Sequence, residues 1–401
     1  MRWTFCSATS FCWRDSWPRT SFMPSPPSFE TTTKLVARAL HVTPAQLLAA
    51  LRPAGEGDLA AVLLLRQENI GPSIVWDDEA YLTWRYRFGR TGYGFGDLWM
   101  AMHEGELLGF IGVEDMVCTH ASRRVTGGRV MDILVAPRTK NSGLGIWLSQ
   151  AMFRQNTFTL SVGANPNSVG TVHRLYALLP QPGMYQHPID LQRYLEQRFG
   201  AGIMTRAAAQ LGNLTMRCWR QLSRLTAGNA WTIKAVNRFD KSVEALAAKA
   251  SIGPNEVVVE RSADYLNRRL FDSPRSAYSV WGAYRGGEWL GYIAWRITLR
   301  SDSEVWMHVI DLQVDAVQHD AALRALLAFS LRQAELARCN FVGVTLQSGQ
   351  YTGVLRRHGF LGPKNNVHHI VGLHAADPEL LRTLCSGNWT LTDLCADQDG
   401  Y

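Results

Sequence analysis

An apolar run ending at Val135 is followed by a polar turn and then by two glycines, Gly143 and Gly145, that open a helix-like pattern. At the start of a helix the backbone N–H groups lack intrahelical acceptors and lie at the positive end of the helix dipole, so they bind anions. Glycine is needed where phosphate oxygens approach the backbone too closely for a β-carbon. Arg138 and Lys140 add positive charge at the rim. The segment is therefore predicted to bind a pyrophosphate.

Two familiar nucleotide-binding loops do not fit this segment. A Walker A loop ends in Gly-Lys-Ser/Thr, whereas this loop continues as Gly145-Ile146-Trp147. A dinucleotide-binding fingerprint requires a third glycine at position 148, which is Leu148. The remaining pattern is Lys140-x-x-Gly143-x-Gly145.

This pattern resembles motif A of the GNAT superfamily of N-acetyltransferases, whose loop reads Gln/Arg-x-x-Gly-x-Gly/Ala. Lysine stands here in place of the usual glutamine or arginine. The preceding Val135-Ala136-Pro137 and the later Leu175-Tyr176 also resemble that superfamily. The chain departs from it after Tyr176, where Ala177-Leu178-Leu179-Pro180 replaces the usual Gly-Phe. The resemblance covers roughly residues 51 to 180 and again 231 to 374.

The resemblance implies that acetyl-CoA or a longer acyl-CoA lies along the strand ending at Val135 and transfers its acyl group to a small amine. Backbone amides there would stabilise the charge that develops on the thioester oxygen. Tyr176 is the implied acid for the leaving thiolate, and Glu114 is the preferred base. The expected cofactor-binding residues are Leu134, Val135, Arg138, Lys140, Asn141, Ser142, Gly143, Leu144 and Gly145.

Segments of the chain recur in the same order at offsets of 179 to 184 residues. Tyr81-Leu82-x-x-Arg85 recurs as Tyr265-Leu266-x-x-Arg269, and Asp132-x-x-Val135 recurs as Asp311-x-x-Val314. Such an internal repeat predicts a duplicated domain. Counting 179 residues on from the glycine loop places Ala322 and Arg324 at the glycine positions. The second copy is therefore expected to have no cofactor site. Asp132 is disfavoured as the base because the second copy keeps Asp311.

Alternating and helical apolar patterns agree between the two copies and predict a mixed α/β fold with two tandem GNAT-like domains. The predicted strands are 98–103, 107–116, 129–135 and 158–162 in the first copy, and 278–284, 289–299, 309–314 and 341–346 in the second. The predicted long helices are 143–155 and 321–337. The expected divisions are a flexible leader 1–50, a domain 51–182, a helical linker 183–230, a degenerate domain 231–376 and a tail 377–401.

The linker contains a basic amphipathic helix at about 203–226. Its apolar residues include Met204, Leu211 and Leu214, and arginines occupy the opposite face. The favoured hypothesis is that the apolar stripe packs on one or both domains. The less favoured alternative is a surface for anionic lipid, nucleic acid or an acidic substrate.

The composition favours a soluble globular protein, with 46% hydrophobic and 19% charged residues. Its seven cysteines are scattered and contain no Cys-x-x-Cys pair, which argues against a zinc site or a disulfide framework and indicates a reducing cytoplasm. His368 and His369 are adjacent, and adjacent side chains on a strand point to opposite faces, so no metal is expected.

Three functional hypotheses remain open from the sequence. The first is an acyl-CoA-dependent N-acyltransferase acting on an amino sugar or an amino acid. The second is a non-catalytic GNAT-like protein that binds acyl-CoA or a partner. The third is a Fem-type aminoacyl transferase, which resembles this duplication but lacks a pyrophosphate loop of this form.

Overall fold

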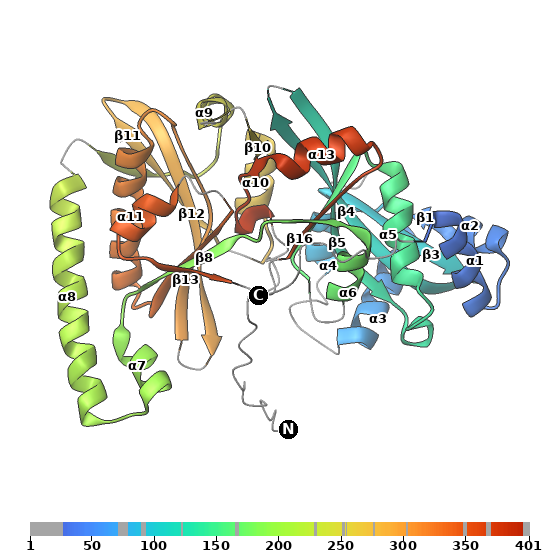
Figure 1. Cartoon of the computed structure of the whole chain (residues 1–401), viewed down its shortest axis with the longest axis horizontal. Helices are drawn as coiled ribbons and strands as arrows, with labels where there is room; N and C mark the ends of the chain where they lie inside the picture. The colour runs from blue at the N-terminus through green and yellow to red at the C-terminus, as the bar shows by residue number, and fades with distance from the viewer. Residues whose placement is uncertain are drawn as a thin grey trace.

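The computed structural model describes twelve parts of the chain: residues 27–70, 79–89, 94–121, 123–164, 168–227, 231–250, 253, 255–275, 277–301, 304–347, 351–365 and 370–395. Two mixed β-sheets lie side by side with helices on their faces (Figure 1). None of the described helices is both long and apolar enough to cross a membrane. The histidine pair 368–369 and leader residues 1–26 lie outside the described residues.

The first sheet has the strand order β1-β3-β4-β5-β6-β16-β7. Along this path the strands are β1 Leu51–Pro53, β3 Gly96–His103, β4 Glu106–His120, β5 Arg123–Val135, β6 Phe158–Val162, β16 Val371–Ala375 and β7 Ala177–Leu179. Three short strands join from the side: β2 Tyr86–Arg87, β10 Glu256–Val259 and β17 Asn388–Trp389.

The second sheet repeats this plan with the order β15-β8-β14-β13-β12-β11-β9. Its strands are β15 Leu361–Asn365, β8 Gly183–Pro188, β14 Phe341–Leu346, β13 Glu304–Val314, β12 Glu288–Ser301, β11 Ser279–Arg285 and β9 Thr232–Ala235. The predicted strands are therefore confirmed in type and order in both copies, and 158–162 and 341–346 match β6 and β14 at both ends.

Each sheet takes an internal strand from the other half of the chain. β16, from the second copy, lies between β6 and β7 of the first sheet, where Leu373 pairs with Leu160 on one side and Ala177 on the other. β8 begins the segment expected as a helical linker, 183–230, but it is a strand and lies between β14 and β15 of the second sheet. Figure 1 shows β8 in light green among the orange strands, and red β16 beside the green and teal ones. Neither sheet is complete without the other half of the chain.

The helices follow the same duplicated order. α5 Leu144–Gln155 and α11 His319–Leu336 cover one face of their sheets, and both confirm the predicted long helices. The others are α1 Phe29–Ala39, α2 Pro44–Ala50, α3 Leu59–Ile70, α4 Glu79–Arg85, α6 Val169–Leu175, α7 Leu191–Phe199, α8 Ile203–Ala227, α9 Ser242–Ala250, α10 Ala263–Leu270, α12 Thr352–Arg357 and α13 Pro378–Ser386. Short 3₁₀ turns occur at η1 Glu56–Asp58, η2 Pro137–Thr139 and η5 Asp393–Cys395.

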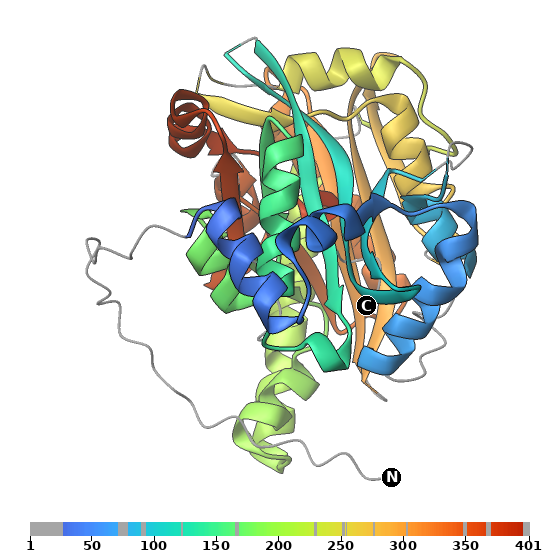
Figure 2. The same cartoon turned by 90° about the vertical axis from the view of Figure 1, so that its right-hand side faces the viewer.

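Residues 27–50, the described part of the segment expected as a flexible leader, are folded. α1 and α2 pack on α5 and β3, with Val36 and Leu47 in the core cluster that contains Trp147 (Figure 2). The indole Nε1 of Trp147 donates to the Thr33 hydroxyl at 2.9 Å. The sequence held usable signals here, because Ser28 caps α1 and Thr43-Pro44 begins α2 with a capping box.

The segment expected as a tail, 377–401, joins both sheets. Trp389 on β17 is buried in the core of the first sheet. Leu394 is buried in a cluster with Tyr292 and Ile310 of the second sheet. The C-terminal residues through Cys395 are therefore part of the core between the two halves.

Asp132 on β5 holds α3 and α4 on the sheet. Its carboxylate accepts hydrogen bonds from Arg66 at 3.0 Å and from the Tyr86 hydroxyl at 2.8 Å, and Arg85 lies 3.7 Å away. In the second half, Asp311 also binds an arginine and a tyrosine, Arg261 at 2.9 Å and the Tyr292 hydroxyl at 2.6 Å, although these residues come from other positions in the fold. This recurring structural contact explains why both copies keep the aspartate.

Separate halves are predicted not to fold alone, because each would lack a central strand of its sheet and expose its apolar edges. Fragments 27–229 and 230–395 should each lack cooperative thermal unfolding, yet should co-purify as a folded complex when expressed together. Circular dichroism melts and co-purification test this. A fragment that melts cooperatively by itself would show that the exchanged strand is dispensable.

Asp132 should make the protein lose stability in acid. Burial alone would raise the pKa of Asp132, but Arg66 and Arg85 outweigh it and lower the pKa to about 2. The stabilisation is therefore present above the unfolded-state value of about 3.9 and is lost as pH falls towards 2. The free energy of unfolding, measured in urea between about pH 5 and pH 2.5, should fall less steeply for Asp132→Asn than for the wild type. Asp272→Asn, in an exposed pair with Arg238, is the control and should leave the slope unchanged.

Candidate active site

β5 is paired differently on its two sides, and this opens the first sheet. β4 pairs with β5 as far as Val135, whereas β6 pairs with β5 only from Gly128 to Val130 among the described residues. A register shift opposite Gly112 adds an extra residue to β5 at this point. Among the described residues, Ile133, Leu134 and Val135 therefore have a ladder partner on the β4 side only, and Met131 and Asp132 lie in the bulge. Such an edge can pair with an extended ligand by strand-like hydrogen bonds.

The glycine loop follows this open strand and ends at the start of α5. Gly143 caps the helix with φ +84°, a conformation that favours glycine, and Asn141 also has positive φ, at +69°. The Ser142 hydroxyl accepts a hydrogen bond from the Leu144 N–H at 3.2 Å. Gly145 lies in the first helical turn, where N–H groups have no intrahelical acceptor.

Packing does not explain the glycine at position 145. A β-carbon on Gly145 would meet only ordinary contacts, with Ile133 Cγ2 at 3.7 Å, so packing does not demand glycine there. The missing side chain instead leaves the helix N-terminus open. At the rim, Arg138 is exposed and pairs with Glu106 at 2.5 Å, and Lys140 is exposed.

The corresponding turn in the second half is shorter and carries its own anion. α11 begins only five residues after Val314, so the helix caps correspond as Gly143 and Gln318, and a constant offset of 179 does not hold through this loop. Arg324 therefore lies inside the helix, where it pairs with Asp320. The expectation that Arg324 stands at a glycine position of the loop is wrong. The carboxylate of Asp315 accepts hydrogen bonds from the N–H groups of Val317 and Gln318, at 2.8 and 3.2 Å.

Tyr176 caps the C-terminus of α6 and is buried against α5 and β16. Its ring packs edge-on to Phe153, and a β-carbon on Gly372 would lie 2.7 Å from its Cβ. Burial raises the pKa of the Tyr176 hydroxyl, and the nearby Ser149 hydroxyl offsets this in part. The Ser149 hydroxyl donates its own hydrogen bond to the Gly145 carbonyl. Among the described residues, the buried Tyr176 hydroxyl makes no hydrogen bond. The tyrosine thus packs beside the second and third turns of the helix that begins at the glycine loop.

Glu114 lies on β4 in a buried charge cluster between the two halves. It forms an ion pair with Arg129 of β5, and Arg269 of α10 lies 3.8 Å away. Burial alone would raise the pKa of Glu114, but the two arginines outweigh it and hold the pKa below its usual range. A carboxylate that is hard to protonate is a weak proton acceptor, so these contacts disfavour Glu114 as the base.

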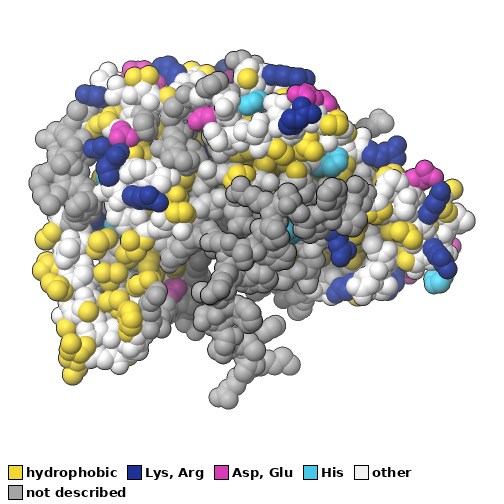
Figure 3. Space-filling model, viewed as in Figure 1, with side chains coloured by type: hydrophobic (Ala, Val, Ile, Leu, Met, Phe, Trp, Pro, Cys, Tyr) yellow, Lys and Arg dark blue, Asp and Glu magenta, His cyan; other side chains and the backbone are white. Residues whose placement is uncertain are grey.

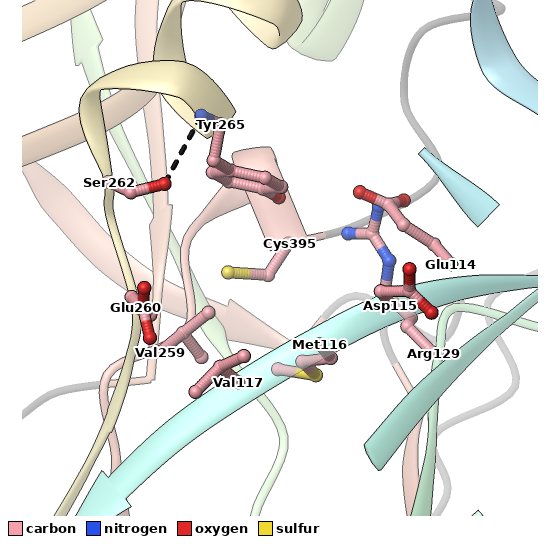
Figure 4. A pocket seen from close by; sticks show the side chains of 10 residues that line it. All are labelled: Glu114, Asp115, Met116, Val117, Arg129, Val259, Glu260, Ser262, Tyr265 and Cys395. Atoms are coloured by element: carbon pink, nitrogen blue, oxygen red, sulfur yellow. Dashed lines mark hydrogen bonds and ion pairs between the residues drawn. The ribbon is translucent and has the colours of Figure 1, made fainter. Parts of the chain in front are cut away.

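A cavity of about 170 Å³ lies beside this cluster. Figure 4 shows its walls: β4 of the first half on one side, the end of β10 and the start of α10 on the other, and Cys395 at the back. Its polar lining includes Glu114, Arg129, Glu260 and Ser262, and its apolar lining includes Met116 and Val259. The cavity exists only where the halves meet.

Sequence reasoning missed the residues that the second half contributes to this cavity. Tyr265, Ser262 and Cys395 lie far along the chain from β4, and only the pairing of β10 with β4 brings the first two there. The repeat of Tyr81 at Tyr265 was a usable signal, because it marks equivalent helices on the two sheets. Asn69 was also missed: its side chain donates to the Val135 carbonyl at 3.2 Å, at the end of the open strand.

A third histidine near the pair His368 and His369, His374, could complete a metal cluster by composition, and of the three only His374 lies within the described residues. His374 lies on β16, where its ring stacks on Phe153 at 3.8 Å. Within the part of the chain that the structure describes, no group of three or more potential ligands has the geometry for a metal ion.

Known structures share this fold at low sequence identity. No family model and no curated protein sequence matches the chain. A GCN5-related N-acetyltransferase from Kribbella flavida superposes with a TM-score of 0.50 at 15% identity, covering 82% of this chain and 71% of that one. A GCN5-related N-acetyltransferase from Anabaena variabilis gives 0.52 at 10% identity, covering 82% and 73%. A conserved protein of unknown function from Enterococcus faecalis, described as a probable N-acyltransferase, gives 0.52 at 10%, covering 83% and 73%.

At these identities the similarity establishes the fold. Because a single chain of each relative matches more than four fifths of this one, the likeness extends over both sheets. The chain therefore has a GNAT-like fold built from two copies of the same α/β unit, as its sequence predicts.

Proposed function

We propose that the protein is an acyl-CoA-dependent N-acyltransferase with a single active site in its first half. The observation that carries this proposal is the junction of the open strand, Met131 to Val135, with the glycine-capped start of α5. An extended pantetheine arm can pair along the strand while the pyrophosphate binds the N–H groups of the first helical turn. The second half offers no equivalent site, because Asp315 already occupies its turn.

The acceptor we propose is a small amine, an amino sugar or an amino acid, bound in the cavity between the halves. Its nitrogen attacks the thioester carbonyl, the carbon–sulfur bond breaks, and the thiolate needs a proton. Backbone N–H groups of the open strand would stabilise the carbonyl oxygen as charge develops. Two solved structures with the same fold are GCN5-related N-acetyltransferases, and this likeness supports an acyl-transfer reaction for the protein.

Tyr176 remains the proposed acid, since it lies beside the helix that carries the loop. For the proton lost by the amine, we propose a chain of water molecules leading out of the cavity. Glu114, bound to Arg129 and near Arg269, is better suited to holding these arginines in the cavity wall than to accepting a proton. An enzyme is favoured over a non-catalytic binding protein because β4 and β5, the strands beside the glycine loop, also form one wall of the cavity. A Fem-type reaction is disfavoured by the open glycine loop.

Gly143→Asp should weaken binding of acetyl-CoA, measured by calorimetry, by roughly tenfold or more, because a carboxylate would face the pyrophosphate at the helix N-terminus. Gly287→Asp is the matched control. Gly287 has φ +87° against +84° at Gly143, and a β-carbon there meets nothing within 4 Å. Both variants carry the same backbone strain, so only a loss confined to Gly143→Asp supports the loop. Equal affinities in the two variants would refute it.

Tyr176→Phe should lower kcat for acyl transfer by about a hundredfold, the usual minimum for losing a general acid. The KM for acyl-CoA and the melting temperature should stay close to wild type, because the buried ring and its contact with Phe153 are kept. Tyr284→Phe, in the second half, serves as the control and should leave kcat unchanged. If Tyr176→Phe has the same kcat as the wild type, Tyr176 is not the acid and contributes only to packing.

A further inference from the structure

The 25-residue helix α8 turns its apolar side outwards. Ile203, Met204, Leu211 and Leu214 are 84%, 83%, 68% and 59% exposed, and Phe199 at the end of α7 is 69% exposed. We call these five residues the apolar face. Figure 3 shows hydrophobic side chains gathered at the lower left, where α7 and α8 lie in Figure 1. The expectation that this stripe packs on the domains is therefore wrong.

The opposite side of α8 is held by polar contacts to α11 and to the start of α7. Arg220 is buried and pairs with Glu335 of α11 at 2.5 Å. Asn213 accepts a hydrogen bond from the Leu191 N–H at 2.8 Å and donates one to Asp190 at 2.9 Å. These polar contacts were stronger determinants of the helix orientation than the apolar stripe, because an unpaired buried arginine is costly. The apolar face is thus held outwards by the fold itself.

The segment that presents the apolar face is strongly basic. Residues 190–227 contain six arginines and no lysine, against Asp190 and Glu196. Arg206 and Arg217 are exposed and follow one edge of the apolar face. A second copy of the chain docking here would bring like charges together. A surface of negative charge would instead be attracted, and it would cover apolar and basic groups at once.

We propose that α8 docks the protein on the surface of a bilayer that contains anionic lipids. The helix is about 37 Å long and lies at the outer edge of the molecule, so it can rest flat on a membrane without obstruction from the sheets (Figure 1). The apolar face enters the boundary of the acyl chains, and the arginines along its edge contact the phosphates. This inference does not depend on the proposed enzymatic activity.

The test is co-sedimentation of the purified full chain with vesicles. Vesicles of phosphatidylcholine with about 30% phosphatidylserine should bind the protein, and vesicles of phosphatidylcholine alone should bind it at least about tenfold less. Leu211→Glu/Leu214→Glu should reduce binding to the anionic vesicles by at least about tenfold. Removing one edge charge, in Arg206→Gln, should reduce it by roughly fivefold.

Leu299→Glu is the matched control, since Leu299 is 67% exposed and lies on β12, not on α8. It should bind vesicles like the wild type. All variants change exposed side chains, and their melting temperatures should match the wild type, which separates lost docking from lost folding. Light scattering tests whether a second copy of the chain covers the apolar face instead. A dimer that the Leu211→Glu/Leu214→Glu variant dissociates, with no vesicle binding, would overturn the proposal, and so would a wild-type monomer that binds no vesicles.

Discussion

The exchange of β8 and β16 is the constraint on which the rest of the structure depends. Each sheet is continuous only because one internal strand arrives from the other half of the chain. The hydrogen bonds on both sides of an internal strand must form together, so the two copies cannot separate or rotate without breaking both sheets. Two repeats that could have been independent domains are thereby joined into a single structural unit.

This joining gives the two halves different roles at one site. The first half keeps the open strand and the glycine-capped helix, while the second supplies Tyr265 and Cys395 to the cavity. The second half also constrains Tyr176, because Gly372 of β16 leaves just enough room for its side chain. In its own turn, Asp315 replaces an external anion with a carboxylate from the chain. Under the proposed function, one copy binds the ligand and the other shapes the cavity beside it.

The sequence predicted what depends on local pattern. Apolar alternation was sufficient to locate β6 and β14, and the internal repeat predicted the duplicated fold. The sequence could not predict that β8 and β16 are exchanged between the sheets. Both strands are short, and the periodicity of a strand does not identify its neighbours. The constant offset failed at the second loop, since a shortened turn shifts the helix cap without changing the flanking strands. The burial of Glu114 between arginines depends on Arg269, a residue 155 positions further along the chain. The orientation of α8 depends on Glu335 in the same way, and neither pairing can be read from local composition.

The position of β16 in the chain also affects synthesis on the ribosome. β6 and β7 leave the ribosome almost 200 residues before the strand that fills the space between them. At translation rates of about 5–20 residues per second, this edge waits on the order of 10–40 seconds for its partner. During that interval the apolar residues of β6, all buried in the finished protein, face an unfilled gap. The nascent first half is therefore the stage at which this protein is most exposed to aggregation and most in need of a chaperone.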